Sequence, residues 1–134
     1  MTTPPQPPPP GGATSPPPGY ASNEEKTWAL IAHFGGAAGM FILSGFGGWI
    51  APLVALLAKG NESQTVRAHA VEALNFQLTW SIVGVIGWAT LCVLIGGVIL
   101  PAAALVGIIF GIIAGVKANE GTLYRYPVSI RMVK

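Results

Sequence analysis

Charged residues are absent from two long stretches of this chain, residues 27–58 and residues 73–116. Apolar side chains dominate both stretches, with glycine, serine and a few amides between them. A helix needs about 20 predominantly apolar residues to cross the hydrocarbon core of a bilayer. Because each stretch is longer than that, the pattern predicts an all-α integral membrane protein that crosses the membrane more than once.

The second stretch is too long for one spanning helix, since its residues would form a rod roughly 66 Å long. Gly96 and Gly97 interrupt it, and Pro101 follows in what we expect to be the first turn of the next helix, where proline costs no hydrogen bond. The pattern therefore predicts two antiparallel spans, 73–95 and 98–116. We expect the first of them to begin near Ser63, after Gly60 and Asn61 end the preceding helix.

The first stretch contains SGFGG at residues 44–48, a run that breaks helices. This run predicts a helical hairpin with limbs near 23–43 and 48–59, and Ser22 with Glu25 fits a capping box at its start. The alternative is a single tilted helix over 27–58. The chain then has either four helices in two hairpins or three spans.

The N-terminal 22 residues differ from the rest, because they hold nine of the chain's 12 prolines and no charge. Such a segment buries little apolar surface, and we expect a disordered tail over 1–22 ahead of a helical transmembrane domain over 23–134. The tail lacks the basic start and apolar core of a secretion signal. Charged residues make up only 9% of the chain and the net charge is +2, so neither a soluble domain nor a nucleic-acid partner is expected.

Two hairpins would bring every lysine and arginine to one face of the membrane. The positive-inside rule makes that face cytoplasmic, so both termini are predicted in the cytoplasm and the protein in a bacterial inner membrane. The lipid bilayer is then the first partner. We expect four residues to anchor the helix ends at the membrane interface, namely Trp28, Tyr124, Arg125 and Tyr126.

Polar residues gather where the second stretch begins. On a helix, His69, Glu72, Asn75 and Thr79 share one face at spacings of three and four. Together with residues nearby they form a candidate polar seam, made of His33, His69, Glu72, Asn75 and Gln77. One interpretation is a metal site or proton relay, and the other, which we favour, is hydrogen bonding between helices. No catalytic motif occurs, so we expect no enzyme activity, no cofactor and no metal.

Glycines recur every four residues in GIIFGIIAG, at Gly107, Gly111 and Gly115. Small residues at this interval allow helix backbones to approach closely in lipid. The pattern predicts a helix-packing face, either within one chain or between copies in a homo-oligomer.

Three segments resemble a known family: ALIAHFGG at 29–36, EALNFQLTW at 72–80 and KANEGTLYRYPVSIR at 117–131. They are similar to a bacterial membrane-protein family of uncharacterised function that includes the magnetosome proteins MamF and MmsF, itself distantly similar to the chloroplast import component Tic-twenty. The resemblance covers roughly residues 24 to 133. It implies an inner-membrane protein of three or four helices with no established enzymatic activity. The shared positions are His33, Asn75, Phe76, Gln77, Lys117, Gly121, Tyr124, Tyr126 and Pro127.

The favoured function is a non-enzymatic membrane scaffold or accessory subunit, which acts through helix packing and contacts on the cytoplasmic face, with another membrane protein as a possible partner. The alternative is a small oligomeric channel or transporter subunit. Coupled carriers usually place an acidic residue within the membrane, and neither uncharged stretch contains one.

Overall fold

The computed structural model describes residues 19–134, which form four α-helices, one short 3-10 turn and no β-strand. The order is α1 (Asn23–Ile42), α2 (Ile50–Lys59), α3 (Gln64–Ala89), η1 (Leu91–Val93) and α4 (Gly96–Asn119). The predicted all-α fold with four helices is confirmed, and the alternative of a single helix over 27–58 is wrong. Most of the predicted N-terminal tail, residues 1–18, lies outside the described residues.

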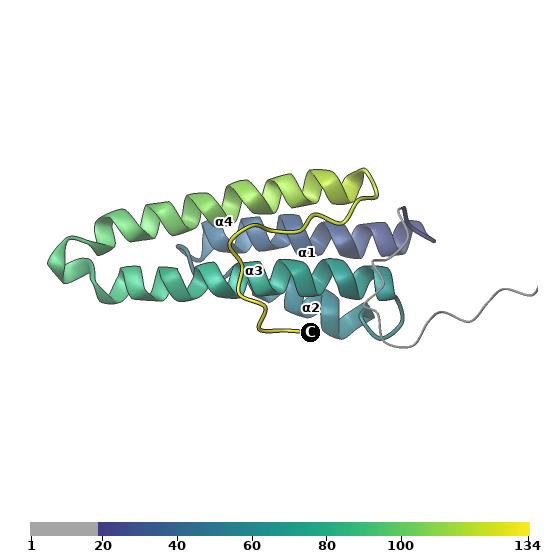
Figure 1. Ribbon diagram of the computed structural model, residues 1–134, viewed down its shortest axis with the longest axis horizontal. Coiled ribbons are helices and arrows are strands. Elements are labelled where there is room, and N and C mark those ends of the chain that lie inside the picture. The colour runs from purple at the N-terminus through teal and green to yellow at the C-terminus, as the bar shows by residue number, and fades with distance from the viewer. Residues whose placement is uncertain (1–18) are drawn as a thin grey trace, which may run out of the picture.

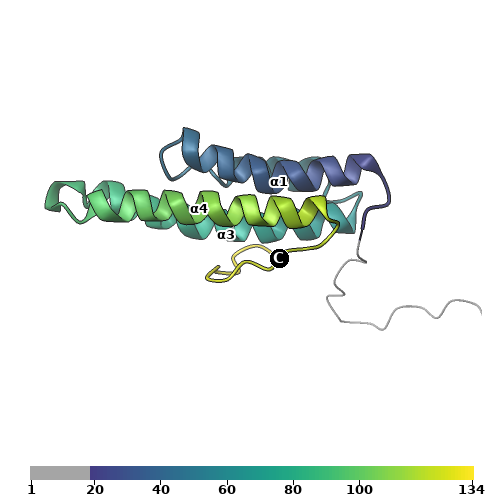
Figure 2. The same ribbon diagram turned by 90° about the horizontal axis from the view of Figure 1, so that it is seen from above.

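The helices form an elongated bundle in which the α1–α2 hairpin packs along the α3–α4 hairpin (Figure 1). The α3–α4 hairpin is longer, and its turn projects beyond the turn between α1 and α2 in both views (Figure 2). After α4, the C-terminal segment, residues 122–134, runs back along the side of the bundle. The bundle therefore has one end where α1 and α3 begin, and an opposite end where the α3–α4 turn projects.

Serine side chains begin two of the helices. Ser22 Oγ accepts a hydrogen bond from the Glu25 N–H, and Ser63 Oγ accepts one from the Val66 N–H. These bonds satisfy N–H groups that have no partner inside the helix. The predicted capping box differs in one detail, because the Glu25 carboxylate accepts from the Ala21 N–H instead of the Ser22 N–H. A further hydrogen bond joins the start of α3 to the start of α1, because Ser63 Oγ–H donates to the Glu25 carboxylate at 2.5 Å.

The break between α1 and α2 falls within the predicted SGFGG run. Ser44 and Gly45 have φ values of 52° and 97°, and the chain reverses there. The return is close, since a Cβ placed on Gly39 would lie 2.5 Å from the Gly47 carbonyl oxygen. Because Gly39 and Gly47 have no side chains, the two limbs of the hairpin can approach this closely.

The turn between α3 and α4 comes earlier than expected. α3 ends at Ala89 instead of residue 95, and Leu94 in the turn has a left-handed φ of 65°. α4 already begins at Gly96, so Pro101 lies inside the helix and not in its first turn. Proline has no main-chain N–H, so the Gly97 carbonyl lacks the helical hydrogen bond that residue 101 would otherwise donate. Both residues are exposed and near the helix start, so water can bind the free carbonyl.

Two helices, α3 and α4, are long and apolar enough to cross a membrane, judged by length and composition within residues 19–134. α2 is apolar but shorter. Much of α3 is buried inside the bundle, whereas most of α4 is exposed. The apolar surface of α4 therefore faces outward along much of its length.

Candidate functional site

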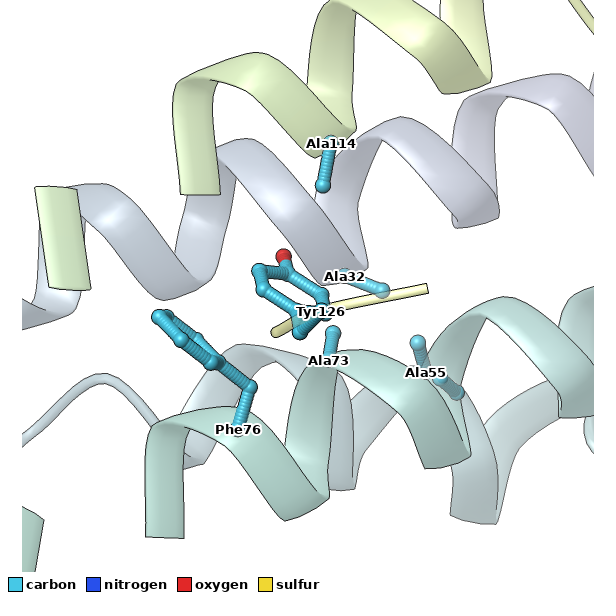
Figure 3. Close-up of a cluster of buried hydrophobic side chains, with 7 residues drawn as sticks. Ala32, Ala55, Ala73, Phe76, Ala114 and Tyr126 are labelled. Carbon is cyan, nitrogen blue, oxygen red and sulfur yellow. The ribbon is translucent and has the colours of Figure 1, made fainter. Parts of the chain in front are cut away.

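The C-terminal segment places one aromatic side chain inside the bundle. Tyr126 is only 4% exposed, and its ring stacks on Phe76 with centroids 4.0 Å apart and planes 19° apart. Alanines from all four helices surround the ring and belong to the same buried cluster, namely Ala32, Ala55, Ala70, Ala73 and Ala114 (Figure 3). These small side chains leave between the helices the volume that the tyrosine fills.

A chain of hydrogen bonds begins at the Tyr126 hydroxyl. Tyr126 Oη lies 2.9 Å from His33 Nδ1, and His33 Nε2 lies 3.1 Å from His69 Nδ1. His69 Nε2 lies 3.4 Å from Tyr20 Oη, and the Tyr20 hydroxyl donates to the Ala118 carbonyl oxygen at 2.5 Å. The chain thus connects the segment before α1 to the segment after α4, through one histidine on α1 and another on α3.

The last bond of this chain sets the direction of all the others. Because Tyr20 donates to a carbonyl, it accepts from His69 Nε2–H, which leaves His69 Nδ1 as an acceptor. His33 then donates through Nε2–H and accepts the Tyr126 hydroxyl proton at Nδ1. Both imidazoles are neutral in this arrangement. Burial raises the pKa of the Tyr20 hydroxyl to about 12, with a further contribution from Glu25, so Tyr20 keeps its proton.

The planes of the two histidine rings are nearly perpendicular, at 80°. Their centroids are 5.3 Å apart, while the facing nitrogens are 3.1 Å apart, so the nitrogens point at each other and not toward a common third atom. This geometry favours the hydrogen-bond interpretation of the predicted seam over a metal site. Within residues 19–134, no three histidine, cysteine, aspartate or glutamate side chains gather closely enough to hold a metal ion.

Glu72 holds the segment beside the tyrosine. Its carboxylate, with a side chain only 5% exposed, accepts from the Tyr126 main-chain N–H at 2.8 Å. Arg131 forms an ion pair with the same carboxylate, and the Arg125 guanidinium lies 3.8 Å from it. A buried carboxylate is stable only with such partners. The partners of Glu72 all come from the C-terminal segment.

Three further side chains of α3 bind the main chain of the segment. Asn75 Nδ2–H donates to the Val133 carbonyl at 2.7 Å, and the Val133 N–H donates to Asn75 Oδ1. Thr79 Oγ1 accepts from the Ile130 N–H at 2.9 Å, and Trp80 Nε1–H donates to the Val128 carbonyl at 3.3 Å. We use the name α3 groove for the row of four side chains on which the segment lies, namely Glu72, Asn75, Thr79 and Trp80.

The structure brings together four of the five residues of the predicted seam. His33, Glu72 and Asn75 each bond to the C-terminal segment, and His69 joins them through its bond to His33, which links α3 to α1. Gln77 points elsewhere, with Nε2–H 3.4 Å from the Gly107 carbonyl oxygen. Its Oε1 atom is buried and has no hydrogen-bond partner among the described residues. Gln77 thus belongs to the packing of α3 against α4.

The three glycines of α4 face α1. A Cβ placed on Gly111 would lie 2.9 Å from Ala37 Cβ, and one on Gly107 would lie 2.7 Å from Met40 Cγ. A Cβ on Gly115 would lie 2.6 Å from the Phe34 ring. All three glycines are buried. In this structure the close approach is therefore made within one chain, between α4 and α1.

The predicted interface anchors lie in different environments. Trp28 and Tyr124 are half-buried against the alanine cluster, and the Arg125 side chain is 70% exposed. The placement of Tyr126 is a correction, because its side chain lies in the core of the bundle and not at a membrane interface. The reason is its neighbours: Phe76 and the alanines enclose the ring, and His33 accepts its hydroxyl proton.

The sequence interpretation missed two residues of this site. Tyr20 was assigned to the disordered tail, yet it bonds to Ala118, and Gly19 N–H donates to the Gly121 carbonyl at 2.9 Å. Arg131 belongs neither to the predicted seam nor to the predicted anchors, yet it pairs with Glu72. The second miss had a readable signal, since a lone acid at the start of a long apolar helix needs a positively charged partner.

One comparison with known proteins identifies a relationship. The model of the family described as "Magnetosome magnetite crystal formation protein family" matches residues 24–133. No curated protein and no solved structure matches the chain.

Proposed function

The chain belongs to the magnetosome magnetite crystal formation protein family, and we propose that it is an integral membrane protein of two helical hairpins that serves as a non-enzymatic accessory subunit. One observation carries the proposal: charged residues and exposed apolar residues occupy different parts of the bundle. All charged residues of α1 to α4 lie near the end where α1 and α3 begin. The rest of each helix carries none.

Large apolar side chains cover the uncharged part. Residues near the two turns are more than half exposed, among them Phe41, Ile42, Leu94, Ile95 and Val98. Contiguous apolar surface of this kind is unusual for a soluble monomer and normal for a surface in lipid. The helix lengths also suit a bilayer. At the α-helical rise α3 and α4 would measure about 39 and 36 Å, which is enough to cross ~30 Å of hydrocarbon. α2 would measure about 15 Å and cross only in part.

The orientation follows from charge. All seven lysines and arginines lie at the charged end or on the C-terminal segment. The positive-inside rule then places this end, and both termini, in the cytoplasm of a cell whose inner membrane holds the protein. For the accessory role, this end supplies exposed charged side chains, such as those of Glu24 and Glu62, which other proteins can contact.

Cysteine labelling tests the orientation. Cys92 is the chain's single cysteine, is exposed and lies in the α3–α4 turn. A membrane-impermeant maleimide should label Cys92 on intact cells. It should label a Cys92→Ser, Lys134→Cys variant only after the inner membrane is opened. The reverse labelling pattern, or release of the protein by alkaline carbonate, would refute the proposal. Ion flux through liposomes that hold the purified protein would favour a channel subunit instead.

A further inference from the structure

The α3 groove recognises the main chain of its occupant more than its side chains. Its side chains bind the N–H groups of residues 126, 130 and 133 and the carbonyls of residues 128 and 133. Every peptide carries these groups, except for the N–H of proline. The groove therefore has the means to bind extended peptides of other sequences, as long as a few side-chain requirements are met.

Two side chains of the occupant make the closest contacts, while Tyr124 packs against the alanine cluster and the Arg125 guanidinium lies 3.8 Å from Glu72. The tyrosine at position 126 fills the alanine-lined space and donates to His33, and the arginine at position 131 pairs with Glu72. In contrast, Val128, Ile130 and Met132 point outward and are 75%, 60% and 43% exposed. The binding requirement is thus a tyrosine followed five residues later by an arginine, with few constraints between them.

The chain's own segment meets these requirements with a strained backbone. Val128 has a φ of 45°, in the left-handed region. In this conformation the Cβ of an L-residue lies too close to the following carbonyl oxygen, and β-branched residues rarely adopt it. Glycine has no Cβ and adopts it without this clash. A peptide with glycine at this position would fit the same groove with less strain than the segment that occupies it.

We propose that the α3 groove is a binding site for an extended peptide of a partner protein, anchored by a tyrosine, with glycine two residues later and arginine five residues later. In this structure residues 122–134 occupy the site from within the same chain. The partner peptide and the chain's own segment compete for it. The site runs along α3 from Glu72, at the charged end of the bundle, to Trp80 in its uncharged part.

Labelled peptides test the recognition rule on the full-length chain in mild detergent. Three peptides of 13 residues are compared by fluorescence anisotropy: the sequence of residues 122–134, the same sequence with glycine at position 128, and that glycine peptide with alanine at position 126. We expect the glycine peptide to bind at least fivefold more tightly than the native sequence. We expect the alanine substitution to weaken binding at least tenfold. Equal affinities of the three peptides, or no binding, would overturn the proposal.

Variants of the chain test the competition. In Tyr126→Ala the native segment loses its anchor, so the peptide of native sequence should bind at least tenfold more tightly than it does to the wild-type chain. Adding Asn75→Ala should reverse this gain, whereas adding Asn61→Ala, in the exposed α2–α3 loop, should leave it unchanged. Circular dichroism checks that each variant is helical.

A measurement on the wild-type chain covers the case in which Tyr126→Ala does not fold. Saturating glycine peptide should displace the native segment, which raises hydrogen exchange at the Tyr126 and Val133 amides at least fivefold. Exchange at α1 amides should stay unchanged. Bound peptide without faster exchange at those two amides would show that the peptide binds elsewhere, and would overturn the proposal.

Discussion

The Tyr126 main-chain N–H donates to the Glu72 carboxylate at 2.8 Å, across 54 positions of sequence. The same carboxylate pairs with Arg131, and the tyrosine ring beside it fills the space between the helices. One acidic side chain on α3 therefore stabilises both the position of the C-terminal segment and the aromatic core of the bundle.

Replacing Tyr126 should affect stability much more than replacing its neighbour Tyr124. Tyr126→Ala removes a buried aromatic ring, and such truncations cost about 3–5 kcal/mol. Tyr126→Phe keeps the ring but leaves His33 Nδ1 without its donor, at a cost of about 1–3 kcal/mol. Tyr124→Ala, at a half-buried position, serves as the control. Thermal unfolding in mild detergent should rank the three variants in that order, and equal melting temperatures for Tyr126→Ala and Tyr124→Ala would contradict the placement of the ring.

Neutralising Glu72 should loosen the C-terminal segment. Glu72→Gln keeps the shape of the side chain but removes the charge that pairs with Arg131 and Arg125, and we expect a cost of about 1–3 kcal/mol. Limited trypsin digestion followed by mass spectrometry should then show faster cleavage after Arg125 and Arg131. The matched control is Glu62→Gln, whose exposed pair with Lys59 contributes little. Unchanged cleavage in Glu72→Gln would mean that the segment is held by other contacts.

A methyl group at Gly111 should destabilise the bundle, while one at Gly97 should not. The added Cβ at position 111 would lie 2.9 Å from Ala37 Cβ and 3.3 Å from the His33 carbonyl oxygen, so α1 and α4 must separate. Overpacking of this kind costs about 1–3 kcal/mol. At Gly97 no atom lies within 4 Å, and alanine favours the helix by up to ~1 kcal/mol.

Melting temperatures of Gly111→Ala and Gly97→Ala give the comparison. Leucine substitutions extend the comparison. Gly111→Leu should melt at a lower temperature than Ile109→Leu, because Gly111 lies against α1 whereas the Ile109 side chain is 50% exposed. If Gly111→Ala melts as high as Gly97→Ala, the contact between α4 and α1 is looser than the structure indicates.

The direction of the hydrogen-bond chain predicts one tautomer for both histidines. Because Tyr20 donates to the Ala118 carbonyl, His33 and His69 should each carry their proton on Nε2 at neutral pH. Nitrogen-15 chemical shifts of histidine-labelled protein distinguish this form from the Nδ1–H tautomer. In Tyr20→Phe the fixed acceptor for His69 is lost, and the two tautomers of His69 should become mixed. A dominant Nδ1–H form in the wild-type protein would reverse the proposed chain.

Local sequence determined the helices of this protein. Ser22 and Ser63 supply the caps, the SGFGG run reverses the chain, and Gly121 at φ 84° follows the end of α4. These features act over a few residues, so their effect is readable without the rest of the molecule. The spacing of Gly107, Gly111 and Gly115 likewise marked a face of α4, but it did not say which helix would lie against that face.

Tertiary structure alone decided where the terminal segments go. Tyr126 in an extended, charged segment looks like an interface residue, and Tyr20 beside prolines looks like part of a tail. Their partners, His33 and Ala118, lie 93 and 98 positions away, and no periodicity links them. Contacts of that kind depend on the volume left between packed helices and on buried polar groups that need partners. Both arise only when α1, α3 and α4 come together, because small alanine side chains then leave a space that a distant aromatic ring fills.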